Sequence, residues 1–95
     1  MKQNFTIADF LPVTSVSSLK TDLKTRIQLR RKEAQFSREE LASRSGVSYG
    51  SIRRFESTGE ISLSSLLKIC HAIGLLGEFN ALFKQPIIKN LKDLK

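Results

Sequence analysis

The sequence contains very few of the residues on which disulfides and metal sites depend. Cys70 is its one cysteine and His71 its one histidine. A single cysteine excludes a disulfide within the chain and is typical of proteins from the reducing cytoplasm. A single histidine, with no CxxC pair and no acidic cluster to join it, excludes the usual protein metal sites. We therefore expect a cytoplasmic protein that holds no metal.

Long apolar runs and catalytic residue sets are missing as well. No apolar run approaches the roughly 18 residues that a membrane-spanning helix needs, and no secretory signal is found. The sequence also has no Ser/His/Asp set, no glycine-rich phosphate loop and no paired carboxylates that would suit a catalytic cleft. We predict a protein that is not an enzyme, needs no cofactor or small-molecule ligand, and does not associate with membranes.

Positive charge is abundant. The chain has 16 lysines and arginines against 9 aspartates and glutamates, a net charge of +7, and most of the basic residues lie between Lys20 and Arg54. Such an excess suits a surface that faces phosphates, although charge alone fits an ordinary solvated surface equally well. With 95 residues, the chain has room for one small helical domain and not for a large enzymatic cleft.

The stretch SREELASRSGVSYGSIRRFESTG, residues 37–59, predicts two short helices joined by a tight turn. Ser37 and Glu40 have the spacing of a capping box, in which each side chain bonds the backbone N–H of the other residue at the start of a helix. Gly46 suits the positive φ with which helices often end. Ser48 is then placed to cap the second helix.

That second helix, expected from residue 49 to about residue 57, has an apolar and a polar face. At about 100° per residue, Ile52, Phe55 and Glu56 fall on one side. The other side carries Gly50, Arg53, Arg54 and Ser57, with Tyr49 and Ser51 at its edges. This arrangement is typical of the helix-turn-helix unit, whose second helix enters the major groove of DNA. Helix pairs joined by glycine are common elsewhere, so spacing alone leaves DNA binding open.

A long first helix is expected before this pair, capped by Ser17 or Ser18. The buried side of this helix is predicted to carry Leu19, Leu23, Ile27 and Ala34. The opposite face is basic, with Lys20, Lys24, Arg30 and Lys32. Residues 1–16 lack helical periodicity, and we predict an extended N-terminal arm that packs on its own domain or on a partner subunit.

Two more helices are expected after the pair. The fourth, capped by Ser62 or Ser64 and ended by Gly74, is predicted to bury Leu63, Leu66, Leu67, Cys70 and Ile73. Because Cys70 lies on this apolar stripe, we expect a buried, structural thiol. The fifth helix is expected over residues 76–84, ended by Pro86. The domain would then span residues 17–84 and a C-terminal tail residues 85–95, as a short strand or a final helical turn.

Apolar residues near the C-terminus exceed what four helices need to close a core. Such a surplus marks either a subunit interface or additional monomer core, and we favour the interface because helix-turn-helix proteins commonly bind two half-sites as symmetric dimers. The residues expected at this dimer interface are Phe79, Leu82, Phe83 and Ile87.

The pattern S-R-E-E-L-A-x-x-x-G-V-S-x-x-S-I-x-x-F-E strongly resembles the lambda-repressor-like, or Cro/XRE, helix-turn-helix family. The resemblance extends from about Leu19 to Ile73 and implies an all-α, five-helix domain with short extended terminal segments. It also implies an internal ion pair between Arg31 and Glu56. Arg38 stands where the family usually has a glutamine that touches DNA phosphate, a contact that arginine can make with a full charge.

Double-stranded DNA is therefore the expected partner. Arg38, Ser48 and the lysines of the first helix would hold phosphates, and Arg54 would make a bidentate contact to guanine. The full set of expected DNA-contact residues is Arg38, Ser48, Tyr49, Gly50, Ser51, Arg53 and Arg54. Glu60 is unfavourable for DNA if it faces the same way.

The C-terminal half, from F-E-S-T-G-E-I-S-L to the L-L-G-E-F-N-A-L-F run, looks like the HipB-like subgroup. These are DNA-binding antitoxins that accompany HipA-type kinase toxins. The resemblance implies a homodimeric repressor of its own operon that also binds a kinase-type toxin. The alternative is a protein-interaction module that neutralises a partner protein and has little or no specific DNA binding.

Overall fold

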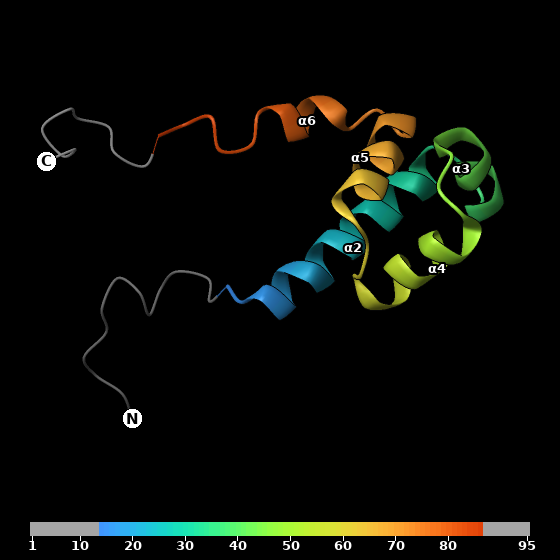
Figure 1. Cartoon of the computed structure of the whole chain (residues 1–95), viewed down its shortest axis with the longest axis horizontal. Coiled ribbons are helices and arrows are strands. Elements are labelled where there is room, and N and C mark those ends of the chain that lie inside the picture. Colours follow the sequence, from blue (N-terminus) through green and yellow to red (C-terminus); the bar gives the residue numbers. More distant parts are fainter. Residues whose placement is uncertain (1–13, 87–95) are drawn as a thin grey trace, which may run out of the picture.

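The computed structural model describes residues 14–86, and within them the chain is all-helical, as the sequence predicts. Five helices follow one another, namely α2 (Val16–Glu33), α3 (Arg38–Ser45), α4 (Tyr49–Thr58), α5 (Leu63–Ala72) and α6 (Leu76–Asn80). Figure 1 shows α3, α4 and α5 gathered around α2, whose first turn extends away from them. The predicted arm up to residue 13 and the predicted tail from residue 87 lie outside the described residues.

The start of α2 differs from the prediction. Ser15, and neither Ser17 nor Ser18, is its N-cap. The Ser15 hydroxyl accepts a hydrogen bond from the Ser18 N–H, and the Ser18 hydroxyl accepts one from the Ser15 N–H, each at 3.0 Å. This is a capping box in which serine replaces the usual glutamate or glutamine, so a search for the usual motif does not find it. Val16 therefore belongs to the helix and not to the arm.

The end of α2 is a Schellman turn with Gln35 in the left-handed conformation, at φ 62°. The Gln35 N–H donates to the Lys32 carbonyl at 2.9 Å, and the Phe36 N–H donates to the Arg31 carbonyl at 3.2 Å. The prediction that Ala34 is buried is wrong. Ala34 is the C-cap, where the chain leaves the helix, and its side chain is exposed.

The pair α3 and α4 forms as the sequence predicts. Ser37 and Glu40 make both bonds of the capping box, at 3.0 and 2.9 Å. Gly46 ends α3 with φ 76°, and Ser48 caps α4 by accepting the Ser51 N–H at 3.1 Å. These local signals fix the turn and therefore the angle between α3 and α4.

The core lies between α2, α3, α4 and α5. Its buried apolar residues are Ile27, Leu41, Val47, Ile52, Phe55, Ile69 and Cys70. Burial raises the pKa of the Cys70 thiol to about 11, with a smaller contribution from the Glu78 carboxylate, so the thiol stays protonated. The prediction of a buried Leu63 is wrong, because Leu63 is the first residue of α5 and is 67% exposed at the helix start. Ile69, which the predicted stripe omits, is fully buried.

Helix α6 is shorter than the predicted helix over residues 76–84. It has no side-chain cap, contains Gly77 in its first turn and ends at Asn80. The chain continues in turns, in which Phe83 takes a left-handed φ of 61°. Pro86 therefore does not end this helix, because the helix has ended six residues earlier through weak capping and low helix propensity.

Candidate nucleic-acid interface

Two buried side chains determine how α4 faces the solvent. Ile52 is 1% and Phe55 3% exposed, and both pack into the core from the same side of the helix. Because α4 has 3.6 residues per turn, fixing these two side chains turns Arg53 and Arg54 outward, and both are exposed. The structure thus places the two arginines on the face that the sequence assigns to DNA.

The N-terminal turn of α4 presents small and polar groups beside the two arginines. Gly50 is exposed, with no other group within 4 Å of the place where a Cβ would stand. Tyr49 is 39% exposed. The Ser48 hydroxyl, in addition to capping the helix, donates to the Ser51 hydroxyl at 2.9 Å. Of the six α4-side residues predicted to contact DNA, Ser51 is half-buried and the other five are exposed, and all six lie at or within the first two turns of this helix.

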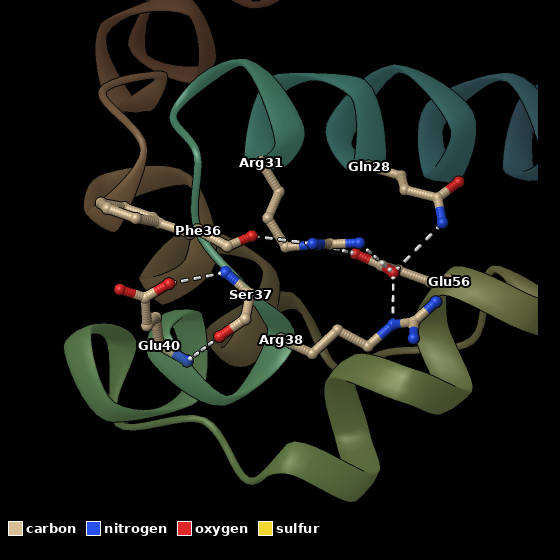
Figure 2. A network of polar contacts seen from close by, with 7 residues as sticks. All are labelled: Gln28, Arg31, Phe36, Ser37, Arg38, Glu40 and Glu56. Atoms are coloured by element: carbon tan, nitrogen blue, oxygen red, sulfur yellow. Dashed lines mark hydrogen bonds and ion pairs between the residues drawn. The ribbon is translucent and has the colours of Figure 1, made fainter.

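Glu56, on the inward side of α4, is the centre of a polar network (Figure 2). Arg31 donates from Nε to Glu56 Oε2 at 2.7 Å and from Nη2 to Oε1 at 3.0 Å, so the pair that the resemblance implies is present and bidentate. The third nitrogen of Arg31 donates to the Phe36 carbonyl at 2.8 Å. Arg38 Nε donates to Glu56 Oε1 at 2.8 Å, and Gln28 to the same oxygen at 3.3 Å.

This network ties three helices together and carries one net positive charge. Arg31 and Glu56 are 7% and 3% exposed at their side chains and neutralise each other. Arg38, with 38% of its side chain exposed, adds a second guanidinium to the same carboxylate. Burial opposes ionisation of Glu56, but the hydrogen bonds from Arg31 and Arg38 outweigh it and lower the pKa of the carboxyl. Ion pairing with Glu56 raises the pKa of Arg38 above its usual value.

Sequence reasoning missed the attachment of Arg38 to Glu56. The resemblance assigns Arg38 to DNA phosphate alone, whereas in the structure its Nε is bonded to a buried carboxylate. The sequence alone does not reveal this bond, because it forms only when α3 and α4 pack together. Gln28 was missed for the same reason, because its partner lies 28 residues away.

Two of the α2 lysines that were predicted to hold phosphates have partners within the chain. Lys20 forms an ion pair with Glu60, and Lys24 donates to the backbone carbonyl of Glu56 at 3.4 Å. The Lys20 ammonium lowers the pKa of Glu60 and offsets its negative charge. The concern that Glu60 repels DNA is thereby reduced. A Cβ at Gly59 would lie 3.2 Å from the Lys20 carbonyl oxygen, so the loop after α4 lies directly on α2.

The residues predicted at a dimer interface do not share one environment. Phe79 is partly buried and packs against the core. Leu82 and Phe83 are 49% and 93% exposed. Ile87 lies outside the described residues. Two of the four residues therefore offer apolar surface in this chain.

Comparison with protein families gives a match. The model of the family described as Helix-turn-helix matches residues 27–77, which contain α3, α4, α5 and the whole Glu56 network. Comparison with curated proteins and with solved structures gave no significant match. Among the helices of residues 14–86, none has the length and apolar character needed to cross a membrane.

Proposed function

Because the chain belongs to this helix-turn-helix family of DNA-binding regulators, we propose that it is a sequence-specific transcriptional regulator that binds palindromic operator DNA as a dimer. The observation that carries the proposal is the orientation of α4. Burial of Ile52 and Phe55 leaves Arg53 and Arg54 exposed on the face opposite the core. A helix held in this way can place its outward side chains in the major groove.

Base recognition would fall to the exposed face of α4. Arg54 would donate two hydrogen bonds to O6 and N7 of a guanine, and Arg53 would contact either a base or a phosphate. Tyr49 would pack on a thymine methyl or reach a phosphate. Gly50 and Ser51 would let the backbone of the first turn approach the DNA closely, since the exposed Gly50 has no side chain to prevent it.

Phosphate binding would fall to Arg38 and Ser48. Because Nε of Arg38 is bonded to Glu56, its guanidinium is held in place while its terminal nitrogens remain as donors. Ordering this side chain before DNA arrives would reduce the entropic cost of the contact. The excess positive charge of the Glu56 network would favour a phosphate at this position.

A dimer would place two copies of α4 in successive major grooves, about 34 Å apart. The exposed Leu82 and Phe83 support an interface beyond α6, with Phe79 and Ile87 as the remaining proposed members. Two half-sites joined in this way would account for recognition of a palindrome by two identical chains.

We further propose that the regulator is an autorepressing antitoxin with a HipA-type kinase toxin as partner. Support comes from the resemblance of residues 55–83 to the HipB-like subgroup. Affinity purification of the tagged chain from its native host should recover a kinase-like protein along with the operator. Recovery of the operator without a protein partner would reject the antitoxin role and leave the regulator role in place.

DNA binding itself is tested by fluorescence anisotropy with the promoter region of the chain's own gene, against a scrambled duplex of equal length. We expect tighter binding to the promoter duplex, with affinity for both duplexes falling as salt rises. Absence of binding to either duplex at low salt would favour the alternative, a module that neutralises a partner protein without contacting DNA.

A further inference from the structure

An apolar groove lies between α2 and the segment that follows α5. It has a volume of about 540 Å³, and Leu19, Leu23 and Ile27 of α2 form one wall. Phe79 and Leu82 lie on the other wall. The groove is separate from the exposed face of α4 that is proposed to contact DNA. The α2 residues that bond α4 and the loop after it lie on a different side of α2 from the groove, and they are Lys20, Lys24, Gln28 and Arg31. Figure 1 shows α6 and α4 on opposite sides of this helix.

We propose that residues 5–11 of the N-terminal arm lie in this groove, on their own chain and antiparallel to α2. Three properties of the molecule favour this occupant over a second copy of the chain or over the C-terminal tail. They are the position at which the arm joins the domain, the composition of the arm, and the charges on the groove rim.

The arm joins the domain near the end of the groove that Leu19 lines. It precedes Thr14 directly, and Leu19 lies within the first turns of α2. The distance from Val16 to Arg30 along the helix is about 21 Å at a rise of about 1.5 Å per residue. Roughly seven extended residues cover that distance. The arm is therefore long enough to fold back over the whole groove, and its attachment gives it a high effective concentration there.

The arm has the apolar side chains that the groove requires. Residues 5–11 are FTIADFL, with Phe5, Ile7, Phe10 and Leu11 as candidates for burial. Pro12, which cannot continue a helix backward from α2, is suited to the change of direction. Exposed to water, four such side chains would be costly, and the groove offers apolar side chains on α2 close to the point where the arm joins it.

The charges on the rim select between the candidates. Arg26 and Arg30 line the groove against one carboxylate, Glu78. Both arginines are held loosely, since Arg26 lies 4.0 Å from Asp22 and Arg30 3.6 Å from Glu33, with their side chains 69% and 54% exposed. An acidic group entering the groove would therefore meet arginines whose present ion pairs are long and exposed.

The arm supplies that group, because residues 5–11 contain Asp9 and no basic residue. The tail over residues 87–95 has Lys89, Lys92 and Lys95 against one aspartate, and would add positive charge beside the two arginines. A two-fold contact between two grooves would bring four arginines together with two copies of Glu78. Like charges in an interface disfavour both arrangements.

Seating of the arm would change the proposed dimer surface. Phe79, Leu82 and Phe83 all line the groove, so the arm would cover part of each, and a contact between two copies would rely on the part of Phe83 that stays exposed. The arm proposal and the DNA-binding proposal are independent, since α4 lies on the other side of α2.

A tryptophan reporter tests the proposal, because the full chain contains no tryptophan of its own. In Phe10→Trp we expect blue-shifted emission and protection from iodide quenching. Adding Leu19→Glu, at a groove wall that is 40% exposed, should return the emission to that of a solvated tryptophan. The matched control is Leu29→Glu, on the same helix and 52% exposed but outside the groove, which should leave the blue shift intact. Circular dichroism confirms that each variant is folded.

Three results would overturn the proposal. One is solvated emission from Phe10→Trp and also from a second reporter, Phe5→Trp. Another is an equal loss of the blue shift in the Leu19→Glu and Leu29→Glu variants. The third is loss of the blue shift on dilution to nanomolar chain, which would place the arm on a second copy. A further test places the reporter in the tail, as Ile88→Trp. If this tryptophan is protected and Leu19→Glu removes the protection, the tail occupies the groove and the arm proposal is rejected.

Discussion

Glu56 has 3% of its side chain exposed and accepts hydrogen bonds from two guanidinium groups. Removing one partner of a buried ion pair leaves the other charge without compensation, so the two arginines should differ in their effect on stability. Arg31 is almost fully buried and makes two bonds to Glu56 and one to a backbone carbonyl. Arg38 makes one bond and is partly exposed.

We therefore predict that Arg31→Ala lowers the free energy of unfolding by roughly 3–5 kcal/mol, the usual loss when a buried pair is broken. Arg38→Ala should cost about 1 kcal/mol or less, because Glu56 keeps both bonds from Arg31 and Arg38 is itself partly exposed. Urea denaturation followed by circular dichroism measures both values. Equal losses for the two variants would mean that Arg31 is not the principal partner of Glu56.

The lowered pKa of Glu56 makes stability depend on acidity. The unfolded chain, with an ordinary glutamate pKa of about 4.3, binds the proton more tightly than the folded chain does. The contribution of this carboxylate to stability is therefore present above about pH 4.3 and is lost as the pH falls through the lower folded-state pKa.

We predict that urea midpoints measured from pH 7 to pH 3 fall at the acid end, and that Glu56→Gln removes part of that fall by lowering stability at neutral pH. Glu60→Gln is the control. Lys20 also lowers the pKa of the Glu60 carboxyl, but this pair is exposed and screened by solvent. Glu60→Gln should therefore change the pH dependence of the midpoint only slightly. If the urea midpoints of Glu56→Gln and of the parent chain fall equally as the pH is lowered, Glu56 is not a source of the pH-dependent stability.

Arg54 and Arg38 should affect DNA binding in different ways, since one is proposed to contact a base and the other a phosphate. Arg54→Ala should cost roughly 1–3 kcal/mol at one base pair and relax specificity there. Arg38→Ala should weaken operator and random DNA alike and reduce the slope of affinity against salt. Anisotropy titrations on both duplexes at several salt concentrations distinguish these results. An equal loss on both duplexes for Arg54→Ala would reject its role in base recognition.

At the scale of the elements, the ends of the helices decide how well the sequence predicts the fold. Ser37 with Glu40, Gly46 and Ser48 use standard capping signals, and the helices they bound were predicted correctly. Ser15 bonds with Ser18 in a less common capping box, and the start of α2 was missed. Helix α6 has no capping side chain, and its end was misplaced by several residues.

The sequence predicts which residues face the core well within one helix and poorly where two helices meet. Burial of Ile52 and Phe55 is a matter of helical period within one element, and the sequence predicts it. Leu63 fits the periodic stripe of α5, but whether it is covered depends on how far the neighbouring helices extend. The bond between Arg38 and Glu56 likewise requires the packing of α3 on α4. Such contacts between elements cannot be derived from period and spacing alone.

Two left-handed positions give opposite predictions for stability. Gln35, at φ 62°, has a Cβ in a conformation that disfavours side chains, so Gln35→Gly should raise the free energy of unfolding by about 1 kcal/mol. Gly46, at φ 76°, has nothing within 4 Å of an added Cβ, so Gly46→Ala should lower it by about 1 kcal/mol through backbone strain alone.

Gly59→Ala completes the series. Its φ of 80° adds the same strain, and its Cβ would also lie 3.1 Å from the Lys20 Cβ and 3.2 Å from the Lys20 carbonyl oxygen. Thermal unfolding should therefore show a larger loss for Gly59→Ala than for Gly46→Ala. A higher melting temperature for Gly46→Ala, or a lower one for Gln35→Gly, would contradict the conformational argument.

On the scale of the whole molecule, α4 with its exposed arginines and the segment after α5 that carries Leu82 and Phe83 lie on different sides of α2, so the proposed DNA binding and self-association can be tested separately. Phe83 is the clearest target, since 93% of it is exposed and it contributes almost nothing to the core. Its replacement should leave the monomer folded while removing apolar surface from the proposed interface.

We predict that Phe83→Glu shifts sedimentation from dimer to monomer at micromolar concentration, with an unchanged circular dichroism spectrum. It should also weaken binding to a two-half-site operator much more than binding to a single half-site, because the second α4 is no longer linked to the first. Leu63→Glu is the matched control, being an exposed leucine at the far end of α5 that no proposed interface includes. If Phe83→Glu and the control sediment alike, the dimer does not use this residue. If both retain tight operator binding as monomers, recognition of the DNA does not require two linked copies of α4.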